Sequence, residues 1–235
     1  MKSLSVILCT YNEEKFIENT LKKLLKEKII AEIIIVDDNS KDKTINIING
    51  FKNKKIKLYV RKNIRGFASA FNYGIKRSNC DYILRFDVDM YSNIKKFIYF
   101  FKIYNNKDCI IFSRYVKKGK DLRGNYRKLS SLVLNKLCNY LLSSKIKDYT
   151  SCIMIFNRNI LKDIQIENTI YANFIIKFAY NLIVKNKNFI ELPFVQNKIT
   201  EKNSKSAPNI KIFIKNGLLY LLTIVECLFI RVKKN

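Results

Sequence analysis

Residues 4–37 read LSVILCTYNEEKFIENTLKKLLKEKIIAEIIIVD and predict a strand, a helix and a second strand in succession. The first run, residues 4–9, is short, apolar and partly β-branched, as in a buried strand. The apolar positions that follow recur at helical spacing: Phe16, Ile17, Leu21, Leu24 and Leu25. Residues 32–37 then repeat the strand pattern. Because a helix separates the two strands, we expect them to lie parallel in one sheet.

The same alternation continues along the chain. We predict further strands at residues 56–60, 82–87, 109–112, 151–156 and 189–194. We predict helices around residues 45–48, 66–77, 92–104, 129–142 and 174–182, and a basic loop at 114–127. This order implies an α/β fold, with a mostly parallel sheet and helices on both of its faces.

The length of 235 residues supports one well-buried domain with a short appendage. A hydrophobic share of 48% favours an ordered core. Residues 201–208 are polar and lack periodicity. We therefore expect a domain at residues 1–208 and a helical tail at residues 209–235.

Composition narrows the possible functions. The 45 Lys and Arg residues against 19 Asp and Glu residues favour anionic partners, although biased composition alone explains the charge equally well. No aromatic-basic RNA motif is present, so nucleic acid is not the expected partner. Histidine is absent, which excludes Ser-His-Asp and Cys-His triads and histidine-containing zinc sites. The six cysteines form no CxxC pair and predict buried, reduced thiols in a cytosolic setting.

Three predicted strands end in acidic or polar clusters, at residues 10–14 (TYNEE), 37–40 (DDNS) and 87–89 (DVD). Ligands of an open parallel sheet bind beyond the carboxyl ends of its strands, so we expect the clusters to meet in one crevice. The carboxylates of Asp87 and Asp89 suit a divalent cation, which would stabilise a departing nucleoside diphosphate.

The other two clusters offer groups for a nucleoside. Asp37 and Asp38 are placed to hydrogen-bond a ribose or base, with helix capping as the alternative. Tyr11 suits stacking on a base, and Asn12 and Glu13 suit hydrogen bonding to it. None of these clusters identifies a function by itself.

In their order along the chain, the clusters resemble the family-2 glycosyltransferases of the GT-A fold, a Rossmann-like architecture. The resemblance is strongest to the dolichyl-phosphate mannosyltransferase-like branch and extends over about residues 4 to 205. The motifs that carry it are SVILCTYNEE (5–14), IIIVDDNSKDKT (33–44), NIRGFASAFNYG (63–74), DYILRFDVDM (81–90), SRYV (113–116), DYTS (148–151), ELPF (191–194) and SK (204–205).

The resemblance implies a role for each matching position. The residues that would line the nucleoside pocket are Cys9, Tyr11, Glu13, Val36 and Asp38. Those that would hold the diphosphate and a Mg²⁺ or Mn²⁺ ion are Asp87, Val88 and Asp89, with Asp89 the more direct metal ligand and Arg65 adding charge. Those that would grip an acceptor phosphate are Arg114, Arg127, Ser131 and Lys205, because a guanidinium pairs with two phosphate oxygens at once.

The primary hypothesis is an inverting transfer of a hexose from a nucleotide sugar to a polyprenyl or dolichyl phosphate. A phosphate oxygen is already ionised at neutral pH and needs no general base, which fits the lack of histidine. One alternative is a glycan or lipid hydroxyl acceptor in cell-surface polysaccharide or glycolipid synthesis, with Asp148 as the base. Another is an inactive GT-A fold that serves as a basic membrane- or nucleic-acid-binding module.

The chain departs from the family pattern in several places. Cys9 stands where proline is usual, and Tyr91 where glutamine or serine often helps to hold the metal. Ile199 stands where the mannosyltransferases carry an arginine. Both GDP-mannose and UDP-sugars therefore remain open as donors.

Residues 209–232 are long enough to cross a bilayer as a helix. The charged side chains fall on one narrow stripe and leave a broad apolar face: Lys211, Lys215, Glu226 and Lys233. This pattern predicts a helix in the membrane interface, with packing on the domain or a partner subunit, or a membrane span, as alternatives. Since residues 4–9 are too short for a signal peptide, we expect a peripheral or monotopic protein at the cytoplasmic face of the cell membrane.

Overall fold

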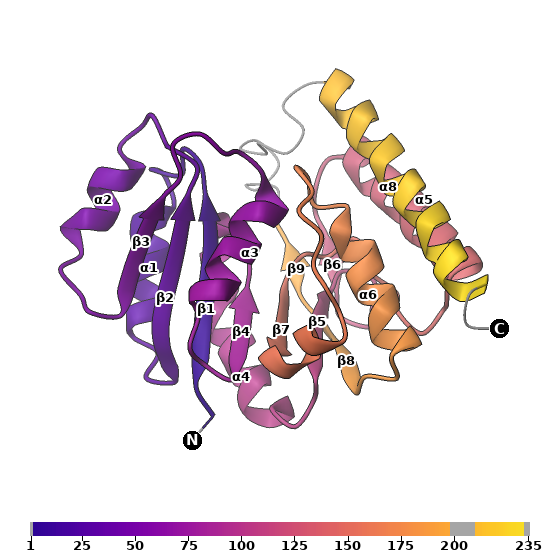
Figure 1. The fold of residues 1–235 in the computed structure, drawn as a ribbon, viewed down its shortest axis with the longest axis horizontal. Coiled ribbons are helices and arrows are strands. Elements are labelled where there is room, and N and C mark those ends of the chain that lie inside the picture. Colours follow the sequence, from indigo (N-terminus) through magenta and orange to yellow (C-terminus); the bar gives the residue numbers. More distant parts are fainter. Residues whose placement is uncertain (1, 198–209, 233–235) are drawn as a thin grey trace.

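The computed structural model describes residues 2–197 and 210–232. Within them a seven-stranded sheet has the order β3-β2-β1-β4-β7-β5-β8 (Figure 1). The strands are β1 (Leu4–Thr10), β2 (Ile30–Asp37), β3 (Ile56–Val60), β4 (Tyr82–Arg85), β5 (Cys109–Ser113), β7 (Met154–Asn157) and β8 (Phe189–Pro193). All the predicted strands are present, with ends shifted by a few residues.

One strand of the sheet runs against the others. β7 is antiparallel to β4 and β5, while the other neighbouring strands are parallel. The prediction of a mostly parallel α/β sheet is thus confirmed. Because Met154 pairs with Arg85, the residues just before β7 lie at the carboxyl edge where β4 ends.

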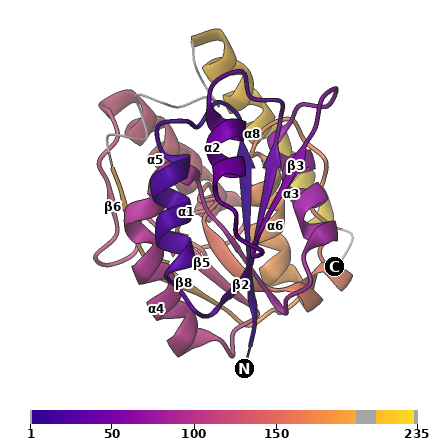
Figure 2. The same cartoon turned by 90° about the vertical axis from the view of Figure 1, so that its left-hand side faces the viewer.

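Each face of the sheet has its own layer of helices, because side chains alternate along a strand. In β1, Val6 and Leu8 pack on one side and Ile7 on the other. Helices α1 (Ile17–Leu25), α2 (Thr44–Gly50) and α4 (Ile94–Tyr104) cover the first side. Helices α3 (Phe67–Arg77), α6 (Phe174–Val184) and α8 (Ile210–Val232) lie on the second (Figure 2). Helix α5 (Asn125–Leu141) adds side chains to the same core cluster and packs against α8.

Short elements modify the predicted pattern. The segment expected as a basic loop contains β6 (Lys120–Asp121), which pairs with β9 (Val195–Gln196) in a small second sheet. Helix α5 begins at Asn125, four residues before the predicted start at Leu129, because the apolar periodicity begins only at Leu129. The 3₁₀ helices η1 (Val88–Asn93) and η2 (Arg158–Lys162) follow β4 and β7.

Helix α8 packs on α5 and α6 through buried Thr223, Ile224 and Cys227, and its opposite side is exposed. By length and composition, residues 211–230 form a helix able to cross a membrane. The predicted boundary at 201–208, together with Ile199, Lys205 and Lys233, lies outside the described residues.

A buried ion pair joins the end of β5 to the segment that leads into β7. The guanidinium of Arg114 donates to both carboxylate oxygens of Asp148, at 2.9 and 2.8 Å, and its backbone N–H donates to one of them at 2.9 Å. Burial alone would raise the pKa of Asp148, but the charge of Arg114 and these hydrogen bonds lower it below its ordinary value.

We predict that Asp148→Asn lowers the free energy of unfolding by about 3 to 5 kcal/mol near neutral pH, because it leaves the guanidinium of Arg114 buried without a counter-charge. A carboxylate with a lowered pKa stabilises the fold above its unfolded-state pKa, and this contribution is lost as pH falls. The difference between the unfolding free energies of wild type and variant should therefore become smaller once the pH falls below 3.8, the ordinary pKa of an Asp side chain. Urea unfolding at about pH 7 and about pH 3 measures both effects.

The matched control is Asp163→Asn. Asp163 pairs with Lys187 at 2.5 Å on the surface, where an ion pair contributes little. Its unfolding midpoint should stay close to wild type at both pH values. A wild-type midpoint for Asp148→Asn at neutral pH would contradict the role given to the buried pair.

Candidate functional site at the carboxyl edge of the sheet

The loops after β1 and β2 are joined by Asp37, the last residue of β2. Its carboxylate accepts hydrogen bonds from the Thr10 hydroxyl at 2.7 Å and from the backbone N–H and hydroxyl of Ser40 at 2.7 and 2.6 Å. Asp37 is fully buried. Asp37 is therefore not available to a ribose, and it does not cap α2 either, whose N-cap residue is Lys43.

Further hydrogen bonds run between the same two loops. The backbone N–H of Asn12 donates to the Ser40 hydroxyl at 2.8 Å, and that of Lys41 donates to the Asn12 side-chain oxygen at 2.7 Å. Asn12 and Asn39 have left-handed φ values of 53° and 60°, which asparagine tolerates better than most residues. Tight turns thus hold both loops at the carboxyl edge.

A cavity of about 310 Å³ opens beside these loops. Its lining residues are Tyr11, Asp38, Asn39, Lys41, Lys62, Asn63, Ile64 and Arg65. The guanidinium of Arg65 lies over the Tyr11 ring, 3.6 Å from the ring centroid. The structure therefore places Tyr11, Asp38 and Arg65 together, and the cationic side chains around them favour an anionic ligand.

Asp38 is held by Arg61, the residue that follows β3. Arg61 Nε donates to one Asp38 oxygen at 2.7 Å, and the Gly66 N–H donates to the other at 3.0 Å. The terminal nitrogens of Arg61 bond to the Gly66 carbonyl and the Ser69 hydroxyl, each at 3.0 Å. Gly66 has a φ of 155°, where a side chain would be strained. Asp38 is thus fixed in orientation and keeps lone-pair capacity for a ligand.

Two predicted pocket residues lie in the core instead. Val36 is fully buried on the α3 side of the sheet, because side chains alternate along β2. Val88 is buried on the other side, and its carbonyl accepts a hydrogen bond from the Thr20 hydroxyl at 2.6 Å. Their side chains therefore do not reach a ligand, and the predicted roles of Val36 and Val88 fall to their backbone atoms.

Cys9 lies within electrostatic range of both halves of the site. Burial raises the pKa of its thiol to about 12, and the thiol also interacts with the charges of Arg85, Asp38, Arg61 and Asp87. Such a thiol stays protonated at neutral pH. Cys9 is therefore a neutral, partly buried residue that packs against the core at the end of β1, and the lining of the cavity does not include it.

Asp87 and Asp89, which follow β4, differ in their surroundings. Asp87 is exposed and forms an ion pair with Arg85, the buried last residue of β4. One carboxylate oxygen of Asp89 is buried and has no hydrogen-bond partner. Burial, together with the nearby carboxylates of Asp87 and Glu13, raises the pKa of Asp89 to about 7.

These surroundings fit a divalent cation, which would supply the charge that the buried Asp89 oxygen lacks. Among residues 2–197 and 210–232, no group of three or more His, Cys, Asp or Glu side chains is arranged to hold a metal. Asp87 and Asp89 would therefore bind it together with the oxygens of a diphosphate.

Tyr91, which stands where glutamine or serine often helps to hold the metal, packs beside Phe16, with ring centroids 6.4 Å apart. Lys23 lies over the Tyr91 ring.

Arg114, the residue predicted to bind an acceptor phosphate, takes part in a buried ion pair. It is buried, and its guanidinium donates to Asp148 and, at 2.6 Å, to the Thr150 hydroxyl. Its Nε and Nη2 are thus engaged within the protein, while Nη1 lies 3.6 Å from an Asp121 oxygen, so the direct grip of Arg114 on an acceptor stays a prediction. Asp148 is a poor general base, since both of its oxygens accept hydrogen bonds from Arg114 and its pKa is lowered.

The other acceptor-side residues are more accessible. Ser131 and Arg127 lie one turn apart on α5 and are only partly buried. The Ser131 hydroxyl is 3.2 Å from the Thr150 hydroxyl, and Arg127 Nε donates to the Tyr126 hydroxyl at 2.8 Å. Lys205 lies outside the described residues.

Sequence reasoning missed three polar residues of this edge: Arg61, Arg85 and Thr150. Arg85 ends β4, Arg61 directly follows β3, and both bind carboxylates of the site. The strand-end rule that selected the acidic clusters would also have selected these arginines. Thr150 gave no comparable signal, because its importance comes from four polar groups that meet only in the folded chain.

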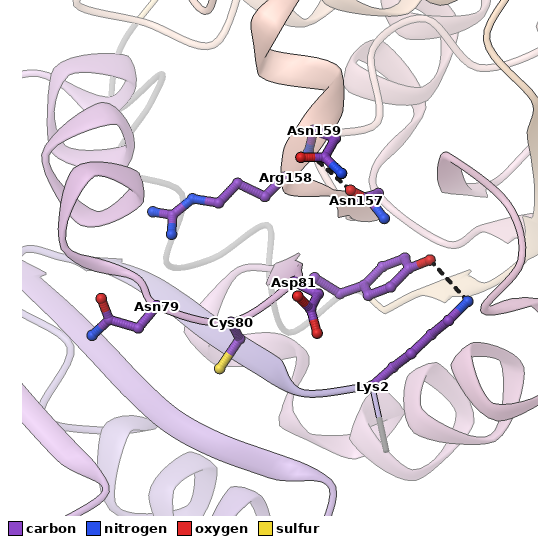
Figure 3. A pocket seen from close by; sticks show the side chains of 8 residues that line it. Lys2, Asn79, Cys80, Asp81, Asn157, Arg158 and Asn159 are labelled. Carbon is purple, nitrogen blue, oxygen red and sulfur yellow. Dashed lines mark hydrogen bonds between the residues drawn. The ribbon is translucent and has the colours of Figure 1, made fainter.

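A second cavity, of about 320 Å³, lies at the opposite edge of the sheet and involves Lys2, Asp81 and Arg158 (Figure 3). Its cations already have partners. Arg158 donates to the Ile75 carbonyl at 2.6 Å, and Lys2 donates to the Tyr82 hydroxyl at 3.3 Å. This cavity lies at the amino ends of β1 and β4, away from the acidic clusters. Ligands of open parallel sheets bind at the carboxyl ends of the strands, so this cavity is not the expected site.

Comparison with known proteins places the chain in a family. Residues 5–165 match the model for glycosyl transferase family 2. A poly-beta-1,6-N-acetyl-D-glucosamine synthase of Staphylococcus epidermidis is 37% identical over 91 residues, which are 38% of this chain and 22% of that protein. An uncharacterized glycosyltransferase of Haemophilus influenzae is 35% identical over 92 residues, or 38% of this chain and 37% of that protein. The matches thus span much less than half of either relative.

Solved structures support the fold over nearly the whole chain. Glucosyl-3-phosphoglycerate synthase from Mycobacterium tuberculosis in complex with UDP has a TM-score of 0.74 at 12% identity, covering 97% of this chain and 80% of that one. The same synthase with Mn²⁺, UDP and glucosyl-3-phosphoglycerate has a TM-score of 0.64 at 12% identity, covering 91% and 79%. The narrower resemblance to dolichyl-phosphate mannosyltransferases stays a prediction. With its GT-A fold and the match over residues 5–165, the chain belongs to glycosyl transferase family 2.

Proposed function

We propose that the chain transfers a hexose from a nucleotide sugar, with a divalent cation, in a single inverting displacement. The observation that carries this proposal is the buried, unpartnered oxygen of Asp89 beside the carboxylate of Asp87. A bound Mg²⁺ or Mn²⁺ would stabilise negative charge on the departing diphosphate. The choice between the two ions is left to experiment.

The chain's own residues bind and orient the donor. Tyr11 offers a ring face to the base, and Asp38, fixed by Arg61 and Gly66, offers a carboxylate to the nucleoside. Arg85 holds Asp87 at the carboxyl end of β4. The base would have to share the Tyr11 ring with Arg65 or displace its guanidinium.

A UDP-sugar is the donor that the comparisons favour over GDP-mannose. Structures of the Mycobacterium tuberculosis synthase contain UDP or UDP-glucose. A transfer assay with a panel of nucleotide sugars, including UDP-glucose and GDP-mannose, tests this donor.

For the acceptor, we propose a hydroxyl of a growing cell-surface glycan or glycolipid. The supporting observation is the 37% identity over 91 residues to a poly-beta-1,6-N-acetyl-D-glucosamine synthase. A hydroxyl acceptor requires a general base. Asp148 does not meet this requirement, so a base would have to come from another group.

A polyprenyl phosphate is the second candidate, and a different observation favours it. The carboxylates near the acceptor side already accept hydrogen bonds: Asp121 from Arg123, Asp148 from Arg114, and Glu191 from two backbone N–H groups. A phosphate acceptor needs no base, and Arg127 and Ser131 are placed to bind it. A lipid acceptor also fits a peripheral or monotopic enzyme at the cytoplasmic face of the membrane, with α8 in the interface.

We predict that Asp89→Asn lowers sugar transfer on the order of 100-fold and weakens Mn²⁺-dependent UDP binding, because the cation loses a charged ligand. Calorimetry with UDP, with and without Mn²⁺, and a transfer assay measure the two effects. The matched control is Asp81→Asn, which changes an exposed carboxylate just before β4, at the opposite edge. Wild-type metal-dependent binding in Asp89→Asn would overturn the proposed metal site.

We predict that Arg127→Gln raises the KM for a short polyprenyl phosphate roughly 10- to 100-fold, because a charge-assisted hydrogen bond to the phosphate is lost. The KM for the sugar donor should not change. Lys128→Gln, which removes the neighbouring exposed cation, is the matched control. Transfer to glycan hydroxyls alone, with no product on the lipid phosphate, would exclude this acceptor.

A further inference from the structure

Helix α8 exposes a long apolar row on the side away from the sheet. Six large side chains of this row are between 43% and 65% exposed: Ile214, Leu218, Leu221, Leu222, Val225 and Phe229. Their spacing of three, four and seven residues places them on one face of the helix. The opposite face contains the buried residues Thr223, Ile224 and Cys227, which contact the domain.

Helix α5 adds a second apolar row. Four large side chains are 56% to 88% exposed and recur at helical spacing: Tyr126, Leu129, Val133 and Tyr140. The two helices lie side by side (Figure 1), with the rings of Tyr126 and Phe213 5.7 Å apart. We define the α5–α8 face as these two rows. Soluble monomers rarely expose so many large apolar side chains in one place.

The charges around the α5–α8 face point to its partner. Lys128 and Lys136 on α5 and Lys211 and Lys215 on α8 are exposed. Helix α5 contains no acidic residue, and Glu226 is the acidic residue within the described part of α8. Apolar side chains flanked by lysines match the boundary between acyl chains and anionic headgroups.

We infer that the α5–α8 face binds an anionic lipid bilayer, with α5 contributing as much of the contact as α8. A second copy of the chain is a poorer partner, because it would bring like charges together in a protein of net charge +26. A span by α8 would have to pull its buried side away from α5 and α6. Both helices instead lie along the bilayer surface.

This inference extends the membrane association proposed above. Lipid binding by the α5–α8 face does not depend on the identity of the acceptor, whereas the link between that face and catalysis rests on the proposed lipid-phosphate acceptor. Arg127 and Ser131 lie on α5 itself, toward its first turns. Residues 120–121, just before α5, pair with the segment that follows β8 at the carboxyl edge. Helix α5 would therefore carry the bilayer contact on its exposed row and the acceptor-side residues on another face of the same helix.

The test is co-sedimentation of the full chain with vesicles of phosphatidylcholine alone or with about 30 mol% phosphatidylglycerol. Wild type should bind the anionic vesicles more tightly. The double variant Leu129→Glu/Val133→Glu on α5 should lower the partition coefficient about 10-fold, because carboxylates replace the apolar contact and repel the headgroups. Leu218→Glu/Leu222→Glu on α8 should have a similar effect.

The matched control is Tyr99→Glu/Ile103→Glu, an exposed apolar pair at the same spacing on α4, outside the α5–α8 face. It should bind vesicles like wild type. Calorimetry of UDP with Mn²⁺ on each variant tests the donor site separately, so failure of the proposed chemistry is distinguishable from failure of lipid binding. Wild-type partition of the α5 variant would overturn the inference, as would a lipid-free dimer that only the α5 and α8 variants disrupt.

Discussion

The carboxylate of Asp37 holds together the two loops on which the donor side of the site is built. A buried carboxylate is unfavourable by itself, and the three hydrogen bonds from Thr10 and Ser40 compensate for its lost hydration. These bonds join the ends of neighbouring parallel strands. Tyr11 and Asp38 follow directly, so their positions depend on a residue that no ligand needs to touch.

The same edge of the sheet contains arginines that are individually neutralised. Arg61 pairs with Asp38, Arg85 with Asp87, and Arg114 with Asp148. These pairs fix the loops without leaving an uncompensated charge in the protein. Asp89 differs, because one of its oxygens is buried and has no partner. This exception is the observation on which the proposed site for a cation and a diphosphate rests.

The family match covers the donor side of the site and helix α5, but not the exposed face of α8. The match ends at residue 165, so α6, β8 and α8 lie beyond it. The donor side, on β1, β2 and β4, lies wholly within the match. The exposed face of α8 lies outside the match. The family therefore says nothing of this face, and its proposed lipid binding is argued from its own side chains.

The sequence by itself determined the order of strands and helices, the mostly parallel sheet and the acidic clusters at the ends of β1, β2 and β4, because local periodicity encodes these features. Only the tertiary structure decided that Val36 and Val88 face the core, and that Arg114 is engaged by Asp148. It also revealed the antiparallel direction of β7 and the pairing of α5 with α8. The physical reason is that burial and hydrogen-bond partners depend on residues distant in the chain: Arg114 and Asp148 are 34 positions apart.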